Sequence, residues 1–403
     1  MGREMRNARL PLFAIALFAL TGVAFASSTH FEIAPTVPLS IHALSLEANR
    51  DVEPTFETYR PTVPLIERDT AATAERIGFY PYWVTVPPAQ LPYAFLSTIA
   101  FFSIEINQSG AVTNVHGWPD GDLVDTAHAH GTKVIVTITN FSASQQQTLL
   151  ASSAYRATAI SNIVHQVDVG GADGVNIDFE NLPVSAKANF VTFIGEMDAA
   201  LHQLLDNPHL SVCTPAIDWA GSYDYDKLAA HADYLFIMAY DYHYSGGDPG
   251  PVAPLYAGGI WPSWCGIDYT LDDYETYLSP YTLAKVVLGL PLYGYDWPTT
   301  SAAVPGVATG SGSAVLQHDA IAMAHDGQHG ARQWDADSQT PYLVYDDGGW
   351  RQLWYTDYFG LAQRIKFGKL RGVGGWGYWA LGYNRADSIY VTTIGREAGD
   401  DGP

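Results

Sequence analysis

The stretch DGVNIDFENL, residues 173–182, decides the fold of this chain. Apolar and polar residues alternate in it, so Asn176, Asp178 and Glu180 share one face if the segment is a strand. Alternate strand residues lie roughly 6.5–7 Å apart. Because buried carboxylates are costly unless they are paired, this polar face favours a functional site over a structural polar cluster. The D-x-E pattern alone is a weak signal.

Eight β-rich apolar runs follow one another along the chain, and DGVNIDFE is the fourth. They cover residues 76–83, 96–106, 133–141, 173–180, 209–217, 233–243, 285–295 and 371–382. Most are separated by helix-compatible stretches, such as residues 184–206 with apolar residues at helical spacing. Buried strands that alternate with helices predict a parallel sheet covered by helices. Eight such units predict an α/β fold of the (β/α)8 TIM barrel type. An open doubly wound sheet is the alternative, but no Gly-rich phosphate loop follows the first run.

The gap between the seventh and eighth runs is long. Residues 340–347 and 350–357 are β-rich and are separated by Gly348 and Gly349, which predicts a hairpin. We therefore expect a small α+β insertion at residues 296–356, between strands 7 and 8, within an ordered barrel domain of residues 76–395.

The two ends of the chain differ in composition from this domain. Residues 1–26 resemble a cleavable export signal, with a basic start, an apolar stretch and the small-x-small sequence at Ala24–Ala26. The alternative is a membrane anchor, for which the apolar run is short. We expect a secreted or periplasmic protein with no stable membrane insertion after cleavage. Residues 27–75, rich in Pro and Thr, predict an extended arm or linker, and residues 396–403 a flexible tail.

The formal net charge is −22. Such a surface repels nucleic acid and anionic lipid. It is compatible with a neutral or cationic substrate, and it could equally serve only to keep the protein soluble. The only cysteines are Cys213 and Cys265, and the sequence leaves open whether they form a disulfide. No Cys/His spacing predicts a zinc site.

Four motifs carry a resemblance to a known family. DGVNIDFE resembles the D-G-x-D-x-D-x-E signature of glycoside hydrolase family 18, the chitinase family. IMAYDYH, residues 237–243, resembles its sixth-strand M-x-Y-D motif. VVLGLPLYGYDW, residues 286–297, resembles its seventh strand, and GVGGWGYWALG, residues 372–382, its eighth. The motifs occur in the family's order, and the resemblance covers residues 76–390.

The resemblance implies a role for each polar residue. Glu180 would protonate the leaving oxygen, and Asp178 would orient the acetamido group of the substrate. The carbonyl oxygen of that group would attack the anomeric carbon, giving an oxazolinium ion and net retention without an enzyme nucleophile. Tyr240 would hydrogen-bond the acetamido carbonyl, and Asp241 would hold the sugar and tune Glu180. We expect no cofactor and no metal.

Aromatic and apolar residues complete the expected sugar site. Trp379 would form the floor of subsite −1 with Met238 beside it, although both are also plausible core residues. The further predicted substrate-binding residues are rings that follow barrel strands on the active face, where they either stack on sugars or serve as packing residues: Tyr82, Trp83, Trp219 and Trp297.

Asn176 departs from the family pattern, in which most members have Asp. We hypothesise that its amide donates permanently to Asp178 in place of a shared proton. The GVNIDFEN form resembles the branch that includes spore-germination and cortex-lytic enzymes.

The resemblance thus implies a glycosidase acting on β-1,4 bonds beside N-acetylglucosamine. With the predicted export signal, we expect an exported enzyme, and we expect a monomer. The polysaccharide is chitin, chitooligosaccharides or peptidoglycan, which the sequence does not separate. The alternative is a chitinase-like lectin that binds such sugars without turnover.

Overall fold

The computed structural model describes residues 39–56, 58–66 and 74–385. The predicted export signal and the predicted C-terminal tail lie outside these residues. None of the described helices is both long and apolar enough to cross a membrane.

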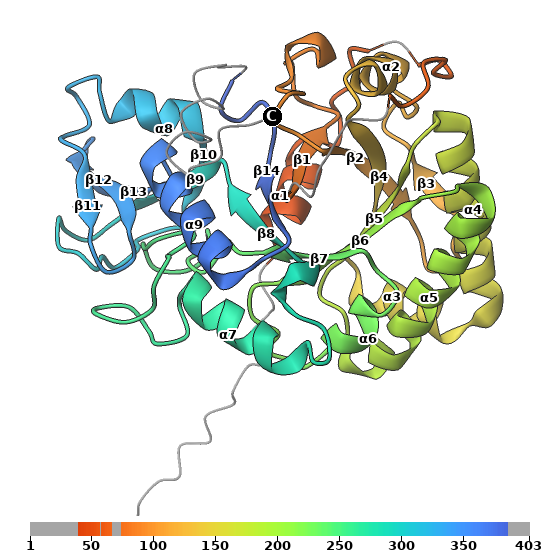
Figure 1. Cartoon of the computed structure of the whole chain (residues 1–403). Coiled ribbons are helices and arrows are strands. Elements are labelled where there is room, and N and C mark those ends of the chain that lie inside the picture. Colours follow the sequence, from red (N-terminus) through yellow and green to blue (C-terminus); the bar gives the residue numbers. More distant parts are fainter. Residues whose placement is uncertain (1–38, 57, 67–73, 386–403) are drawn as a thin grey trace, which may run out of the picture. The chain divides into compact units, whose positions relative to one another are not determined.

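Eight parallel strands close into a barrel (Figure 1). Each pairs with its neighbour in chain order, and pairing of the first strand with both the second and the eighth closes the ring. This confirms the predicted (β/α)8 barrel. The barrel strands are β1 (Glu75–Pro81), β2 (Thr98–Ile106), β4 (Lys133–Asn140), β5 (Gly174–Phe179), β6 (His209–Pro215), β7 (Tyr234–Met238), β8 (Val286–Pro291) and β14 (Gly375–Trp379). A short strand, β3 (Val112–Asn114), pairs antiparallel with β2.

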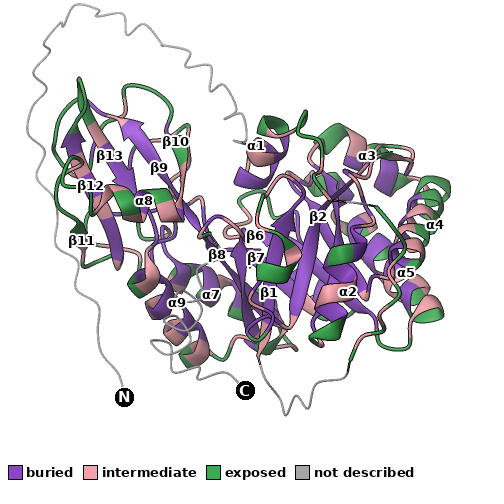
Figure 2. Ribbon diagram, turned by 90° about the horizontal axis from the view of Figure 1, so that it is seen from above, coloured by how far each residue is buried: buried purple, intermediate pink, exposed green. Residues whose placement is uncertain are grey.

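Helices surround the ring of strands (Figure 1). The apolar side chains at helical spacing in α5, such as Phe190 and Met197, are buried. The buried colour in Figure 2 follows the strands and the inner faces of the helices. The helices are α2 (Gly121–Ala129), α3 (Ala143–Ala151), α4 (Ser153–Gly170), α5 (Lys187–Leu204), α6 (Tyr225–Ala229), α7 (Ile267–Tyr277) and α9 (Tyr358–Arg371), with short 3-10 turns at Pro88–Gln90, Val184–Ala186 and Leu283–Lys285.

The insertion between the seventh and eighth barrel strands is a separate antiparallel sheet of order β10-β9-β13-β12-β11. It comprises β9 (Tyr293–Pro298), β10 (Ser313–Leu316), α8 (Gln317–Met323), β11 (Gln333–Asp335), β12 (Thr340–Asp346) and β13 (Trp350–Trp354). The pairing of β12 with β13 confirms the predicted hairpin. The predicted single strand at residues 285–295 is wrong, because β8 and β9 belong to different sheets. Both are buried, so the apolar run continues across the point where the chain changes sheet.

The N-terminal arm also differs from the prediction. We expected residues 27–75 to be extended, but residues 41–48 form a helix, α1 (Ile41–Ala48), capped by the Ser40 hydroxyl. A helix this short is marginal by itself, so its stability must come from packing that no local pattern reveals. The described residues between 51 and 66 contain no helix, and the Asp125 carboxylate of α2 accepts hydrogen bonds from the main-chain N–H groups of Thr62 and Val63, each at 2.7 Å.

The start of DGVNIDFENL has a structural function. Oδ2 of Asp173 accepts a hydrogen bond from Val134 N at 2.7 Å and lies 3.0 Å from Nε2 of His128. A Cβ atom at Gly174 would lie 1.9 Å from the main-chain oxygen of His209, so only glycine allows β5 to approach β6 this closely. These first two residues fix the position of β5, and the later polar residues of the stretch extend toward the carboxyl end of the barrel.

Candidate active site

The polar face of β5 lies inside the barrel. Asn176 and Asp178 are buried within the strand, and Glu180 is buried directly after its end. Parallel barrel strands present their carboxyl ends on one face, which is where barrel enzymes carry their sites. The strand therefore delivers Asp178 and Glu180 to the face predicted from the sequence.

One imidazole shows how closely the predicted residues converge. Nδ1 of His42, from α1, lies 2.8 Å from Oδ2 of Asp178 and 3.5 Å from Oε1 of Glu180. Nε2 of the same ring lies 2.7 Å from the hydroxyl of Tyr240. The ring lies against Trp379, with 3.8 Å between centroids and 30° between planes. Residues from β5, β14 and the segment after β7 thus surround a space the size of one small ring.

Glu180 is placed to hold a proton. Burial raises the pKa of its carboxyl well above the usual range, and the neighbouring charge of Asp178 raises it further. A hydrogen bond with the Ser40 side chain partly opposes this rise in pKa. Nε2 of Gln146, which the sequence did not single out, donates to the main-chain oxygens of Asn140 and Glu180, both at 2.6 Å, and so fixes the backbone at the acid. Such a carboxyl suits general acid catalysis.

Asp241 follows β7 in a left-handed conformation, with φ of 58°. Burial raises the pKa of its carboxyl to about 6, although hydrogen bonds lower it in part. Oδ1 accepts from the Tyr293 hydroxyl at 2.5 Å, and Oδ2 accepts from Ile41 N at 3.1 Å. Tyr293 begins β9, so the inserted sheet supplies a partner to the site that spacing in the sequence did not reveal.

Asn176 does not do what we hypothesised. Its Nδ2 lies 3.3 Å from Sγ of Cys213, and its Oδ1 accepts from the Ser211 hydroxyl at 2.9 Å. Among the described residues, no hydrogen bond joins Asn176 to Asp178. Because β6 is paired with β5 in a register that places Ser211 opposite Asn176, the amide finds its partners across the strands. Its hypothesised donation to Asp178 is wrong in this structure.

Both cysteines are free and buried. Burial and the nearby Asp178 raise the pKa of the Cys213 thiol well above its usual range. Ligand atoms of His42, Asp178 and Cys213 lie within 4.8 Å of one another, a spacing compatible with a metal ion. The direct hydrogen bond between His42 and Asp178 already satisfies two of these three atoms.

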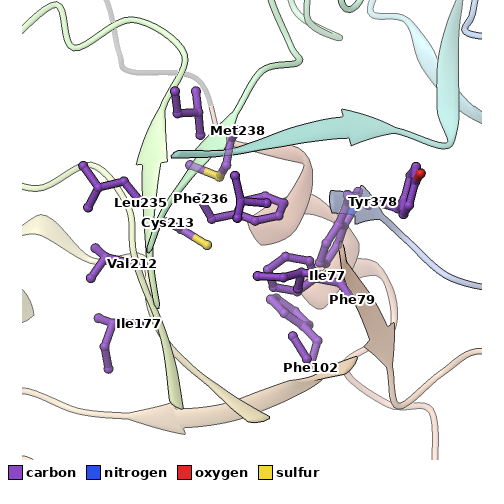
Figure 3. Close-up of a cluster of buried hydrophobic side chains, with 14 of the residues drawn as sticks. Ile77, Phe79, Phe102, Ile177, Val212, Cys213, Leu235, Phe236, Met238 and Tyr378 are labelled. Atoms are coloured by element: carbon purple, nitrogen blue, oxygen red, sulfur yellow. The ribbon is translucent and has the colours of Figure 1, made fainter. Parts of the chain in front are cut away.

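Two of the predicted aromatic and apolar site residues belong to the interior around the imidazole. Trp379 is fully buried beneath His42. Met238 is buried at the end of β7, and Figure 3 shows it in the same cluster as Cys213 and Phe236.

The remaining rings separate into different surroundings. Trp219 is 71% exposed and contacts the ring of Trp264. Trp83 is half-buried, and Tyr82 is buried and donates from its hydroxyl to the main-chain oxygen of Asn49 at 2.7 Å. Trp297 is fully buried, so the prediction that it is an exposed groove residue is wrong. It lies in β9 and packs against Tyr295 inside the inserted sheet.

Comparison with known proteins agrees with this geometry. The family model described as glycosyl hydrolases family 18 matches residues 75–384. The chain is similar to the "Putative sporulation-specific glycosylase YdhD" of Bacillus subtilis, with 29% identity over 300 residues that cover 71% of this chain and 66% of that protein. It is also similar to the cortical fragment-lytic enzyme of Bacillus subtilis, with 26% identity over 302 residues that cover 72% of this chain and 65% of that protein. The chain thus spans slightly less than two thirds of either relative.

A solved structure shares the fold. The family 18 chitinase of Cycas revoluta, in complex with (GlcNAc)3, superposes with a TM-score of 0.71 at 18% identity, over 80% of this chain and 99% of that one.

Proposed function

Since this chain belongs to the glycosyl hydrolases of family 18, we propose that it is an exported glycosidase that cleaves β-1,4 bonds beside N-acetylglucosamine. The observation that carries the proposal is the buried Glu180 carboxyl, whose pKa is raised by burial and by Asp178. It lies at the same small space as Asp178, Tyr240 and Trp379. The relatives and the solved chitinase favour chitin, its oligosaccharides or peptidoglycan as substrates.

The chemistry follows from these residues. Glu180 donates its proton to the glycosidic oxygen as the bond to the anomeric carbon breaks. The acetamido oxygen of the same sugar forms the new bond to that carbon, and Asp178 accepts the acetamido N–H. The pKa of the Tyr240 hydroxyl is raised well above its usual value by burial, so the phenol stays protonated and donates to the acetamido oxygen. Water then opens the oxazolinium ion and gives its proton to Glu180, which restores the acid.

Product analysis tests this proposal. The full chain and the Leu46→Asp variant described below are incubated with chitooligosaccharides, cellooligosaccharides and purified peptidoglycan, and the products are identified by mass spectrometry. We expect cleavage only where an N-acetyl group occupies subsite −1, with retention of the β-anomer seen by proton NMR. Cleavage of cellooligosaccharides would contradict the substrate-assisted mechanism. Sugar binding without products in both chains would favour the lectin.

A further inference from the structure

The sugar site is occupied by the chain itself. The side chains of Ile41, His42, Ala43 and Leu46 on α1 are buried, whereas Glu47 and Ala48 on its opposite face are exposed. His42 is fully buried and contacts residues at or just after the ends of β5, β7 and β14. Figure 2 shows α1 at one end of the barrel strands, and the contacts of His42 place that end at the carboxyl ends of the strands.

The imidazole of His42 presents the hydrogen-bonding pattern of an acetamido group. The Asp178 carboxylate only accepts, so Nδ1 donates to it, and in the neutral imidazole the lone pair of Nε2 then accepts from the Tyr240 hydroxyl. An N-acetyl group offers the same donor and acceptor through its N–H and its carbonyl. The flat ring also lies on Trp379, the residue assigned to the sugar floor. At 3.8 Å between centroids, no sugar ring fits between the two.

The rest of the segment is held by residues that follow β7 and β1. Ile41 N donates to Asp241, and the Tyr82 hydroxyl donates to the main-chain oxygen of Asn49. Leu46 is only 3% exposed. Polar and apolar contacts at both ends of α1 therefore keep His42 in place.

We propose that residues 39–50 form a tethered plug of subsite −1, and that the folded chain is a latent enzyme in which α1 must leave before a polysaccharide can bind. This inference rests on the proposed function, because it identifies the blocked site as the sugar site. The apparent affinity for sugar is then the affinity of the open site multiplied by the fraction of molecules in which the plug is out.

Two features make the plug displaceable. Oδ1 of Asp178 and Oε1 of Glu180 are buried without a hydrogen-bond partner among the described residues, so the helix leaves acceptors that a sugar hydroxyl or N–H would satisfy. Residues 50–53 are exposed, whereas Pro54 lies against Gly117 and Val63 N donates to Asp125. Four extended residues span roughly 13 Å, so α1 can swing out while the arm stays attached.

Matched substitutions on the two faces of α1 test the plug. Leu46→Asp places a charge on the buried face, and Ala48→Asp places the same charge on the exposed face two residues later. We measure kcat/KM on a fluorogenic chitobioside and hydrogen exchange of the amides of residues 43–49. We expect Leu46→Asp to raise kcat/KM by about tenfold or more, because burial of a leucine side chain accounts for at least that factor in an equilibrium. Hydrogen exchange of the α1 amides should accelerate in parallel in Leu46→Asp. The kcat/KM of Ala48→Asp should stay within about twofold of the wild-type value.

Each outcome separates the plug from the proposed function. If wild type and Leu46→Asp hydrolyse the chitobioside equally fast although the α1 amides exchange rapidly in Leu46→Asp, the plug is overturned and the glycosidase stands. If neither wild type nor Leu46→Asp is active although the α1 amides exchange rapidly in Leu46→Asp, the proposed function fails, and the plug fails with it. If α1 remains protected in Leu46→Asp and activity does not rise, the second experiment decides.

A cut in the tether provides that second experiment. A recognition site for a sequence-specific protease is inserted between Val52 and Glu53, and the intact chain is folded before it is cleaved. After the cut, α1 is held only by its contacts, so it dissociates on dilution. We expect the specific activity of the cut chain to rise as the protein is diluted, whereas the uncut chain stays constant. Activity independent of dilution in both chains would overturn the plug.

Discussion

At the residue scale, the state of the site is set by two side chains, Glu180 and His42. Burial and the charge of Asp178 raise the pKa of the Glu180 carboxyl, and Nδ1 of His42 lies 3.5 Å from Oε1 of that carboxyl. The same imidazole nitrogen lies 2.8 Å from Oδ2 of Asp178, so His42 contacts both carboxyl groups.

Glu180→Gln should abolish turnover without loss of sugar binding. The amide keeps the shape of the side chain but cannot protonate the leaving oxygen, and general acid catalysis contributes about 10²–10⁴-fold. We expect kcat to fall by that factor in the Leu46→Asp background. The affinity for a chitooligosaccharide, measured by calorimetry, should not fall. Activity within about threefold of the parent would remove Glu180 from this role.

Asp120 offers a test of electrostatics away from the site. It caps α2 by accepting from Leu123 N at 3.0 Å, and burial raises the pKa of its carboxyl to about 6. The folded state therefore keeps the Asp120 proton to a higher pH than the unfolded state does. The stabilisation that this proton gives is fully present below about pH 4, and it is lost, by at most about 3 kcal/mol, as the pH rises through about 6.

Asp120→Asn keeps the cap oxygen and carries no charge. Its free energy of unfolding relative to wild type should increase between about pH 4 and about pH 7, as measured by urea titration. Asp120→Ala, which lacks the cap, should be less stable than Asn at both pH values. If the difference in the free energy of unfolding between Asp120→Asn and wild type does not change with pH, the assignment of a raised pKa to Asp120 is wrong.

At the scale of elements, the inserted sheet contributes to the site through the first residue of β9. The Tyr293 hydroxyl donates to Asp241 and lowers the pKa of that carboxyl, which burial raises. In Tyr293→Phe, the pKa of Asp241 should therefore rise further above about 6.

If ionised Asp241 holds the sugar, the acidic limb of the kcat/KM–pH profile of Tyr293→Phe should move to higher pH. Tyr342→Phe, in β12 of the same sheet, serves as the control, and its profile should overlay that of the parent. Both are measured in the Leu46→Asp background. An unshifted acidic limb in Tyr293→Phe would show that this contact only supports the sheet.

At the scale of the whole molecule, the net charge of −22 gives no attraction for a neutral sugar. The rate on chitooligosaccharides should thus change by less than about twofold between about 0.05 and 0.5 M salt, because there is no long-range steering to screen. A steep fall in kcat/KM with salt, measured at constant pH in the Leu46→Asp chain, would point to a charged substrate instead.

The sequence by itself determined the barrel, the hairpin of the insertion and the buried polar face that carries Asp178 and Glu180. These depend on local patterns: strand and helix periodicity, turn residues, and a motif whose alternate residues must share a face. It could not determine which partners Asn176 selects, because these come from the neighbouring strand β6 through its register. It also misplaced Trp297, since a continuous apolar run does not show where the chain passes from one sheet to another.

Only the tertiary structure decided what fills the site. Nothing local distinguishes His42 from a histidine on any short helix, and residues 27–75 carry no periodicity that predicts α1. The helix exists because its apolar face and one imidazole find Asp178, Tyr240 and Trp379, which are more than a hundred residues away in the chain. A sequence pattern records how neighbouring residues share a face, whereas the occupation of a pocket depends on distant segments that fold against one another.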